Sequence, residues 1–389
     1  MNIKNKNILI IGSFSIRDWE LLKQRQQTIV EFLVKDFNVF YIERISAKNV
    51  GIIKMLKAFI KRFFLVRNIG GKGQFTMKHL CFIQLKIFPF QRGIFRFLNA
   101  RLALLQIRKI MKKYKINHFD SVIISHPANY VNDIFDKIPA LKRIYDCVQR
   151  FEFNKYFPPE VVFNDKNIAK KVDLVIVDSI TIFNEKLELN KNVVRIPQGI
   201  DIGNYNINRI KDVRIPGDLA NIGKNRICYI GSFHQTFDFD LVRKLAVDIP
   251  AATLILIGSE TSEAKRKLDC KNIVFLGWKH FKQLPIYMEC MDLFIIPYVL
   301  SEHGKGVFPT KLFEYLYFKK PIVSTALPDT LEYEKYLYVA HTEEEFIKFV
   351  QDSLFKGENK LSAIPDDQFE HFISENSWEA RYIEFKKYL

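Results

Sequence analysis

Short apolar runs that alternate with helical patterns recur along the 389-residue chain, and they constrain its fold more than any other feature. The runs are rich in Ile, Val, Leu and Phe, as expected of strands that are buried on both faces of a parallel sheet. They fall at residues 7–12, 38–42, 121–125, 142–147, 173–178, 226–230, 253–257, 273–276, 293–296 and 321–324. Strands that alternate with helices predict an α/β fold of doubly wound, Rossmann-like sheets.

A polar segment divides these runs into two groups. Residues 203–225 contain Pro216, Gly217 and Gly223 and are predicted to be a linker. The length of the chain is sufficient for two domains. We therefore expect domains at residues 1–202 and 226–370, followed by a C-terminal helical segment at 371–389. No GxGxxG follows the first strand, so the sequence does not support a dinucleotide cofactor.

Cysteine usage and the N-terminus indicate a cytoplasmic protein. The five Cys residues are scattered, odd in number and without CxxC spacing, which argues against a disulfide framework or a zinc site. Residues 1–14 contain only a short apolar run and are interpreted as the first strand, not as a signal peptide. No stretch approaches the length of a membrane span.

The net charge of +16 comes from one part of the chain. Residues 44–119 contain eighteen Lys and Arg and no acidic residue. Two basic, apolar helical patterns, at 52–66 and 88–110, indicate attachment to an anionic membrane surface. The predicted membrane-facing cations are Lys54, Lys57, Lys61, Arg62, Arg92 and Arg96. Two alternatives stay open: the apolar faces pack on the domain core, or the patch binds nucleic acid, although no recognised nucleic-acid motif accompanies it.

Residues 308–324 combine a helical pattern, a Lys-Lys turn and a short strand. Pro309 is predicted to open the helix, because proline needs no backbone donor at the first helical position. Lys311 in the first turn would add a full charge to the amides of the helix N-terminus, which suits a diphosphate. Glu314 lies three residues on and could accept hydrogen bonds from ribose hydroxyls. The alternative is an ordinary amphipathic helix with an exposed ion pair.

The order of these elements after the strand at 293–298 resembles the nucleotide-sugar half of GT-B glycosyltransferases of the bacterial polysaccharide type (group 1, family 4-like). It is similar to the teichuronic-acid enzymes and, more distantly, to the xanthan-pathway glucuronosyltransferase. Residues 196–201 (Ile-Pro-Gln-Gly-Ile-Asp) resemble the signature that ends the first domain of this superfamily. The resemblance implies two Rossmann-like domains that face each other across a cleft, with the C-terminal helix crossing back to the first domain.

The resemblance also implies where the substrates bind. Donor-binding residues are expected at Gly231, Ser232, Phe233, Trp278, Lys279, Tyr298, Thr310, Lys311 and Glu314. Acceptor-side residues are expected at Gly12, Arg17, Trp19 and Arg25. Asp238 and Asp240 have the DxD spacing of a metal site in the other glycosyltransferase fold, but here they open a helix and are interpreted as its cap. We expect no metal and no cofactor.

The general base is not settled by the sequence. Related enzymes have a catalytic aspartate at the position of Gln149, and a glutamine cannot act as a base. The remaining candidates are Asp146, Glu152, Asp18 and His126. Retaining members of the wider group have a glutamate eight residues before the ribose-binding one; that position is Gly306, and Glu302 is the nearest acid. This departure favours an inverting reaction.

These observations predict a cytoplasmic glycosyltransferase attached peripherally to the inner face of the plasma membrane. Its partners would be a nucleotide sugar, a lipid-linked saccharide acceptor of cell-surface polysaccharide synthesis and an anionic membrane surface, with no nucleic acid. Two alternatives remain: a soluble nucleotide-sugar 2-epimerase of the same fold, and a catalytically inactive paralogue that acts as an assembly partner.

Overall fold

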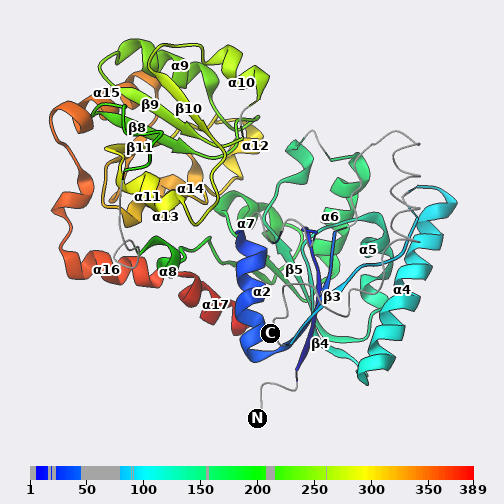
Figure 1. Cartoon of the computed structure of the whole chain (residues 1–389). Coiled ribbons are helices and arrows are strands. Elements are labelled where there is room, and N and C mark those ends of the chain that lie inside the picture. The colour runs from blue at the N-terminus through cyan, green and yellow to red at the C-terminus, as the bar shows by residue number, and fades with distance from the viewer. Residues whose placement is uncertain are drawn as a thin grey trace. The chain divides into compact units, whose positions relative to one another are not determined.

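The computed structural model describes residues 6–15, 19, 23–44, 79–88, 90, 92–154, 157–206, 215–259 and 261–389. The chain forms two compact units (Figure 1). Unit 1 comprises Met1–Asp178, Ile182–Ile196 and Tyr382–Leu389, and unit 2 comprises Ser179–Thr181 and Pro197–Arg381. The chain thus passes into unit 2 shortly before the predicted domain end at residue 202.

Unit 1 is built on a seven-stranded parallel sheet in the order β3-β2-β1-β4-β5-β6-β7. Its strands are β1 (Asn7–Ile11), β2 (Asn38–Ile42), β3 (Leu80–Ile83), β4 (Phe119–Ile124), β5 (Ala140–Cys147), β6 (Leu174–Val177) and β7 (Val193–Arg195). In the register of the sheet Ile11 lies beside Ile42 and Ile124. The loops that follow β1, β2 and β4 therefore meet at one edge of the sheet.

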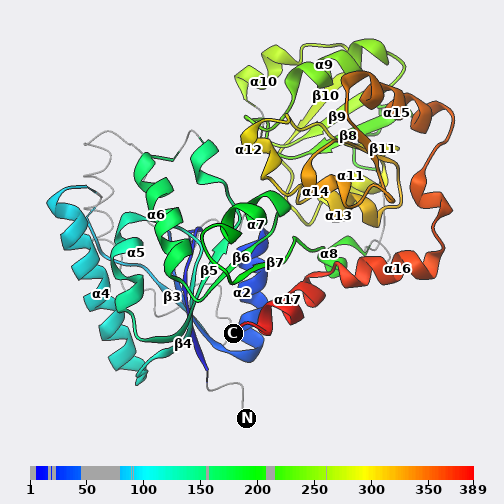
Figure 2. The same ribbon diagram turned by 180° about the vertical axis from the view of Figure 1, so that it is seen from behind.

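Helices surround this sheet, and Figure 2 shows α4 and α5 next to each other on one side of unit 1. The helices are α2 (Arg25–Asp36), α4 (Ile94–Tyr114), α5 (Asn129–Ile134), α6 (Pro159–Lys171) and α7 (Ile180–Leu187). The end of α17 (Trp378–Lys386) joins them, because the Tyr382 hydroxyl and the Lys386 ammonium both donate to Asp36 Oδ2 at 2.6 Å.

Unit 2 contains a six-stranded parallel sheet in the order β10-β9-β8-β11-β12-β13. Its strands are β8 (Arg226–Ile230), β9 (Thr253–Ile257), β10 (Ile273–Gly277), β11 (Leu293–Ile296), β12 (Ile322–Thr325) and β13 (Tyr338–Ala340). Its helices are α8 (Ile202–Tyr205), α9 (Phe239–Asp248), α10 (Ser262–Lys267), α11 (Leu284–Glu289), α12 (Glu302–Lys305), α13 (Leu312–Tyr317), α14 (Pro328–Leu331), α15 (Glu343–Phe355) and α16 (Asp366–Glu375). The residues of the edge strand β10 are half-buried, whereas the other strands are largely buried and supply much of the core of the unit.

The predicted α/β fold with two doubly wound sheets is confirmed. Strands β3, β7 and β13 were not predicted; β7 and β13 have only three residues each. The interpretation of Asp238 as a helix cap is confirmed, since its carboxylate accepts from Leu241 N at 2.9 Å at the start of α9. In the described residues, no helix combines the length and apolar composition that a membrane span requires.

Two predicted helix starts were wrong. The helix expected at Pro309 begins at Leu312, and the preceding residues form a tight turn in which Leu312 N donates to Pro309 O at 2.8 Å. Lys311 is therefore the N-cap of α13 and not a residue of its first turn. The pattern that began at Phe88 becomes helical only at Ile94, because Gly93 has a φ of +55°, a conformation that favours glycine and lies outside the helical region.

Candidate functional site

Lys311 lies inside unit 2, with only 7% of its surface exposed. Its ammonium donates to the Tyr298 hydroxyl at 2.6 Å and lies 4.7 Å and 4.9 Å from the ring centres of Tyr229 and Tyr298. Aromatic faces attract a cation without neutralising its charge. Within the described part of the chain, no carboxylate pairs with Lys311 at salt-bridge distance. Lys311 is therefore a buried positive charge that no carboxylate of the described residues contacts directly.

The loop after β8 approaches this ammonium closely. A Cβ built on Gly231 would lie 3.1 Å from Lys311 Nζ and 2.8 Å from the Tyr229 hydroxyl. The same hydroxyl donates to Ser232 O at 3.1 Å, which holds the loop in place. A glycine is needed here because any side chain would displace the lysine or the tyrosine. The backbone of Gly231 and Ser232 and the Lys311 ammonium thus share one small region.

Glu314 follows Lys311 on α13 and is half-buried. Its carboxylate accepts a hydrogen bond from the hydroxyl of Tyr205, the last residue of α8. Burial raises the pKa of Glu314 to about 7, although the Tyr205 hydrogen bond and the Lys311 charge both favour the ionised form. Near neutral pH the carboxyl is therefore divided between its two protonation states.

This shifted pKa predicts a pH dependence of stability. Because the folded state holds the Glu314 proton up to about pH 7 and the unfolded state releases it near 4.5, stability falls as the pH rises through this window. The shift corresponds to about 1–3 kcal/mol once partial solvent exposure is allowed for. Glu314→Gln should therefore match the wild type at pH 4 and be more stable by that amount at pH 8. Urea unfolding at both pH values measures the difference, and a constant difference between the two would contradict it.

The other predicted donor residues are placed less closely together. Tyr298 contacts Lys311 directly, whereas Phe233 is buried against Tyr229 and Phe237 as part of the core. Ser232 and Thr310 are exposed. Trp278 is 47% exposed, which leaves its ring open to stack on a ligand. Lys279 instead pairs with Asp218 at 2.7 Å, and Asp218 also accepts from Tyr287.

Three residues that surround Lys311 or Glu314 were missed by the sequence reasoning. Tyr229 stands inside a buried strand, where its pattern is that of a core residue. Tyr205 ends a four-residue helix far from Glu314 in the sequence, so no local signal links the two. His234 follows the Gly231–Ser232 loop, and burial together with the charge of Lys311 lowers its pKa.

In unit 1, Arg25 and Asp146 are brought together by the sheet edge. Arg25 Nε lies 3.2 Å from Asp146 Oδ1, and both side chains are buried. Arg25 Nη1 also donates to Ile196 O at 2.8 Å. The predicted acceptor-side arginine and the predicted base thus form one buried ion pair, which joins α2 to the ends of β5 and β7.

The remaining base candidates differ in their surroundings. His126 is buried, and burial together with the charge of Arg44 lowers its pKa to about 3, so the imidazole is neutral at pH 7. Glu152 lies on the surface and pairs with Lys166 at 2.8 Å. Asp18 and Arg17 lie outside the described residues. Each assignment as a base stays a prediction.

Gly12 and Trp19 have structural roles around Tyr41. A Cβ on Gly12 would lie 2.0 Å from the Tyr41 hydroxyl, so only glycine fits there. The Tyr41 hydroxyl donates to Gln26 Oε1 at 2.8 Å, and Gln26 Oε1 also accepts from Ser13 N at 2.9 Å. Trp19 is buried edge-on against Tyr41, with ring centres 5.0 Å apart. Whether these residues face an acceptor stays a prediction.

The predicted membrane-facing cations fall into two groups. Arg92 and Arg96 are ion-paired, with Glu160 at 2.8 Å and Asp133 at 2.5 Å, so they are less available to a membrane than predicted. Lys54, Lys57, Lys61 and Arg62 lie outside the described residues. Within those residues, no group of three or more His, Cys, Asp or Glu side chains could hold a metal ion.

Sequence relatives match parts of the chain. Residues 224–354 match the family described as Glycosyl transferases group 1. A Bacillus subtilis protein named as the teichuronic acid biosynthesis glycosyltransferase TuaH is 34% identical over 115 residues, which cover 28% of this chain and 29% of TuaH. An uncharacterized 41.2 kDa protein in the cps region of Klebsiella pneumoniae is 23% identical over 206 residues, 48% of this chain and 56% of that protein. In both cases less than two thirds of the relative's length is matched.

Solved structures match the whole chain in fold. A sucrose-phosphate synthase from Thermosynechococcus elongatus has a TM-score of 0.72 at 14% identity, with 98% of both chains covered. The Anabaena protein HepE, solved in complex with UDP and glucose, has a TM-score of 0.67 at 13% identity, again over 98% of both chains. At such identities the likeness shows the fold. Residues 224–354 are therefore a glycosyl transferases group 1 domain, in a chain whose fold is that of the GT-B glycosyltransferases.

Proposed function

We propose that this chain is a glycosyltransferase that moves a sugar from a nucleotide-diphosphate donor to a lipid-linked saccharide in cell-surface polysaccharide synthesis. The observation that supports it most is the buried Lys311 ammonium, which has aromatic neighbours and no paired carboxylate among the described residues. A buried charge is costly to keep without a partner, so such a group suits an anionic ligand. The names of TuaH and of the cps-region protein favour polysaccharide synthesis.

The donor would bind to unit 2 without a metal ion. Its diphosphate would meet the Lys311 ammonium and the backbone at Gly231 and Ser232, and its ribose hydroxyls would donate to the Glu314 carboxylate. HepE has been solved with UDP and with UDP-glucose, which favours a nucleotide-sugar ligand for this fold. Charge that develops on the leaving diphosphate would be stabilised by Lys311.

The reaction would be an inverting, single displacement. The acceptor hydroxyl oxygen attacks the anomeric carbon, the bond from that carbon to the diphosphate oxygen breaks, and the acceptor proton passes to a base. Gly306 occupies the position of the retaining enzymes' glutamate and has no side chain to contribute. Glu302, the nearest acid, is exposed and pairs with Lys305 at 2.6 Å.

Turnover tests this proposal. The chain is incubated with a panel of nucleotide sugars and lipid-pyrophosphate saccharides, and release of nucleoside diphosphate is measured together with the extended lipid product. We expect both products to form in equal amounts with one donor. A nucleotide sugar that changes its stereochemistry without any acceptor would identify an epimerase instead. Weak nucleotide binding without turnover, and without any effect of Lys311→Ala, would identify an inactive paralogue.

The membrane part of the proposal is supported by α4. This 21-residue helix contains six cations and no acidic residue, and its buried positions are a single row, Asn99, Ala103, Ile107 and Met111. Its other faces expose large apolar side chains, among them Ile94 at 70% and Phe97 at 73%. Exposed apolar groups among cations favour the surface of an anionic membrane. We propose that the chain attaches there, on the cytoplasmic face of the plasma membrane.

Removal of the apolar side chains tests this attachment. The triple variant Ile94→Ser, Phe97→Ser, Leu98→Ser keeps every charge of α4 but loses the groups that would enter the bilayer interface. It should bind phosphatidylglycerol vesicles at least about tenfold more weakly in flotation assays. Leu331→Ser, which replaces an exposed leucine of unit 2, is the control and should bind as the wild type does. Equal binding by all three proteins would show that the exposed apolar face does not contact the membrane.

A further inference from the structure

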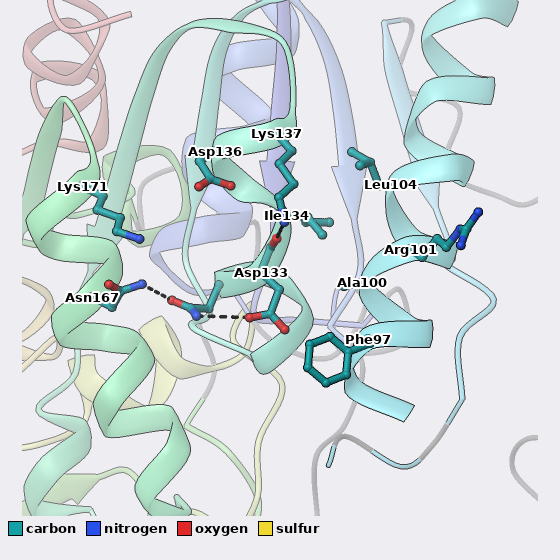
Figure 3. A pocket seen from close by; sticks show the side chains of 11 residues that line it. Phe97, Ala100, Arg101, Leu104, Asp133, Ile134, Asp136, Lys137, Asn167 and Lys171 are labelled. Carbon is teal, nitrogen blue, oxygen red and sulfur yellow. Dashed lines mark hydrogen bonds between the residues drawn. The ribbon is translucent and has the colours of Figure 1, made fainter. Parts of the chain in front are cut away.

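A cavity of about 500 Å³ opens between α4, α5 and α6 in unit 1, and we call it the α4 groove (Figure 3). One wall is apolar and consists of Phe97, Ala100 and Leu104 of α4. The facing wall is polar and includes Asn132 and Asn167, whose amides are joined by a hydrogen bond of 2.6 Å. The groove is therefore amphipathic, and its apolar wall is part of the exposed apolar face of α4.

The charges around the groove are of both signs. The Asp133 carboxylate is neutralised by Arg96, whose Nε and Nη2 donate to it at 2.7 Å and 2.5 Å. Lys171 on α6 and Asp136 after α5 also line the groove, and no ion pair joins either side chain to another described residue. In Figure 3 Lys171 extends toward the groove from the α6 side, whereas Arg101 points away from it. The groove thus offers a cation and a carboxylate that are both available to a ligand.

We propose that the α4 groove binds the headgroup of an anionic glycerophospholipid, with the acyl chains lying against the exposed apolar face of α4. The lipid phosphate would accept from Lys171 and from the Asn167 amide, and the headgroup hydroxyls would donate to Asp136. A bare phosphate ion would leave Asp136 unsatisfied and repelled, which favours a headgroup that has both a phosphate and hydroxyl donors. The five cations of α4 other than Arg96, which is paired with Asp133, draw anionic lipids in preference to neutral ones. This inference rests on the membrane attachment proposed above.

Titration with a soluble lipid distinguishes binding in the α4 groove from general attraction of anionic lipids to the cations of α4. Dihexanoylphosphatidylglycerol, kept below its micelle concentration, is titrated into the full chain by calorimetry. Ala100→Trp fills the groove without altering any charge, and Lys171→Gln removes the cation that would meet the lipid phosphate. Each should weaken binding by about fivefold or more. Lys112→Gln removes the same charge from the exposed last turn of α4, outside the groove, and should leave this binding unchanged.

Two outcomes would contradict the proposal that the α4 groove binds a lipid headgroup. If Lys171→Gln and Ala100→Trp bind the lipid as Lys112→Gln does, α4 attracts lipids by charge alone and the groove has no ligand role. If inorganic phosphate displaces the lipid at equal concentration, the groove is an anion site and not a headgroup site. Unfolding midpoints show whether Ala100→Trp folds, and Lys171→Gln decides the question if it does not. Sugar turnover on a water-soluble acceptor is measured separately, so loss of the proposed transferase activity would not be confused with loss of the groove.

Discussion

Replacement of Lys311 by Met is expected to lower kcat/KM for sugar transfer by about 100- to 1000-fold, the range found when a preorganised donor is removed from a developing charge. The loss should appear both in nucleotide affinity and in kcat, because the ammonium would bind the donor diphosphate and hold it more tightly as it leaves. Calorimetric titration with nucleoside diphosphates and steady-state kinetics measure the two effects.

The same substitution should not destabilise the fold. Lys311 is buried beside Tyr229 and Tyr298, with no paired carboxylate among the described residues, so methionine removes an uncompensated charge and keeps most of the apolar contact. We expect an unchanged or higher unfolding midpoint together with the loss of activity, as in sites where function costs stability. Lys244→Met is the matched control: it removes an exposed lysine of unit 2, paired with Glu343 and Glu344, and should change neither property. A Lys311→Met variant that unfolds early but binds nucleotide normally would make the lysine structural.

The donor side of the molecule could be predicted in part because its signals are local. Proline, lysine and glutamate in residues 309–314 lie within a few positions of one another. The strand that follows them in the sequence indicated that they lie beside a parallel sheet. The partners that set their chemistry could not be predicted in this way. Tyr205 bonds to Glu314 from a separate short helix, and Tyr229 contacts Lys311 from a strand whose residues all have the pattern of a core. Contacts between distant segments leave no periodicity in the sequence.

Contacts in unit 1 likewise join residues from separate elements, and the sequence alone did not reveal them. The side-chain oxygen of Gln26 accepts hydrogen bonds from Ser13 N and from the Tyr41 hydroxyl, which ties α2 to the loop after β1 and to β2. Asp146 was considered as a base because it ends a strand. Its pairing with Arg25 was not foreseen, since the two residues are 121 positions apart. A residue at a strand end can therefore be buried in an ion pair, and its position alone does not distinguish the two roles.

The second large effect is expected at Lys186 in unit 1, where Lys186→Met should lower the free energy of unfolding by about 3–5 kcal/mol. The Lys186 ammonium lies 2.6 Å from Asp165 Oδ2, and both side chains are buried. Burial opposes the charge of Lys186, but the nearby Cys147 and Asp165 outweigh it and raise its pKa above the ordinary value. The Tyr145 hydroxyl donates to Asp165 Oδ1 at 2.7 Å. Methionine would leave the Asp165 carboxylate buried with no cation to balance it.

The double variant Lys186→Met, Asp165→Asn separates loss of the pair from loss of a single partner. Asparagine keeps an oxygen for the Tyr145 hydroxyl but has no charge, so we expect the double variant to recover more than half of the lost stability. Lys166→Met, which breaks the exposed pair with Glu152, should cost less than about 1 kcal/mol. Urea unfolding of the four proteins measures these differences. If the double variant were as unstable as Lys186→Met, the lysine would act through the packing of its alkyl chain. Tyr145 directly precedes Asp146 on β5. Loss of the contacts that Lys186 and Tyr145 make with Asp165 should therefore also loosen the strand end that holds the Arg25 ion pair.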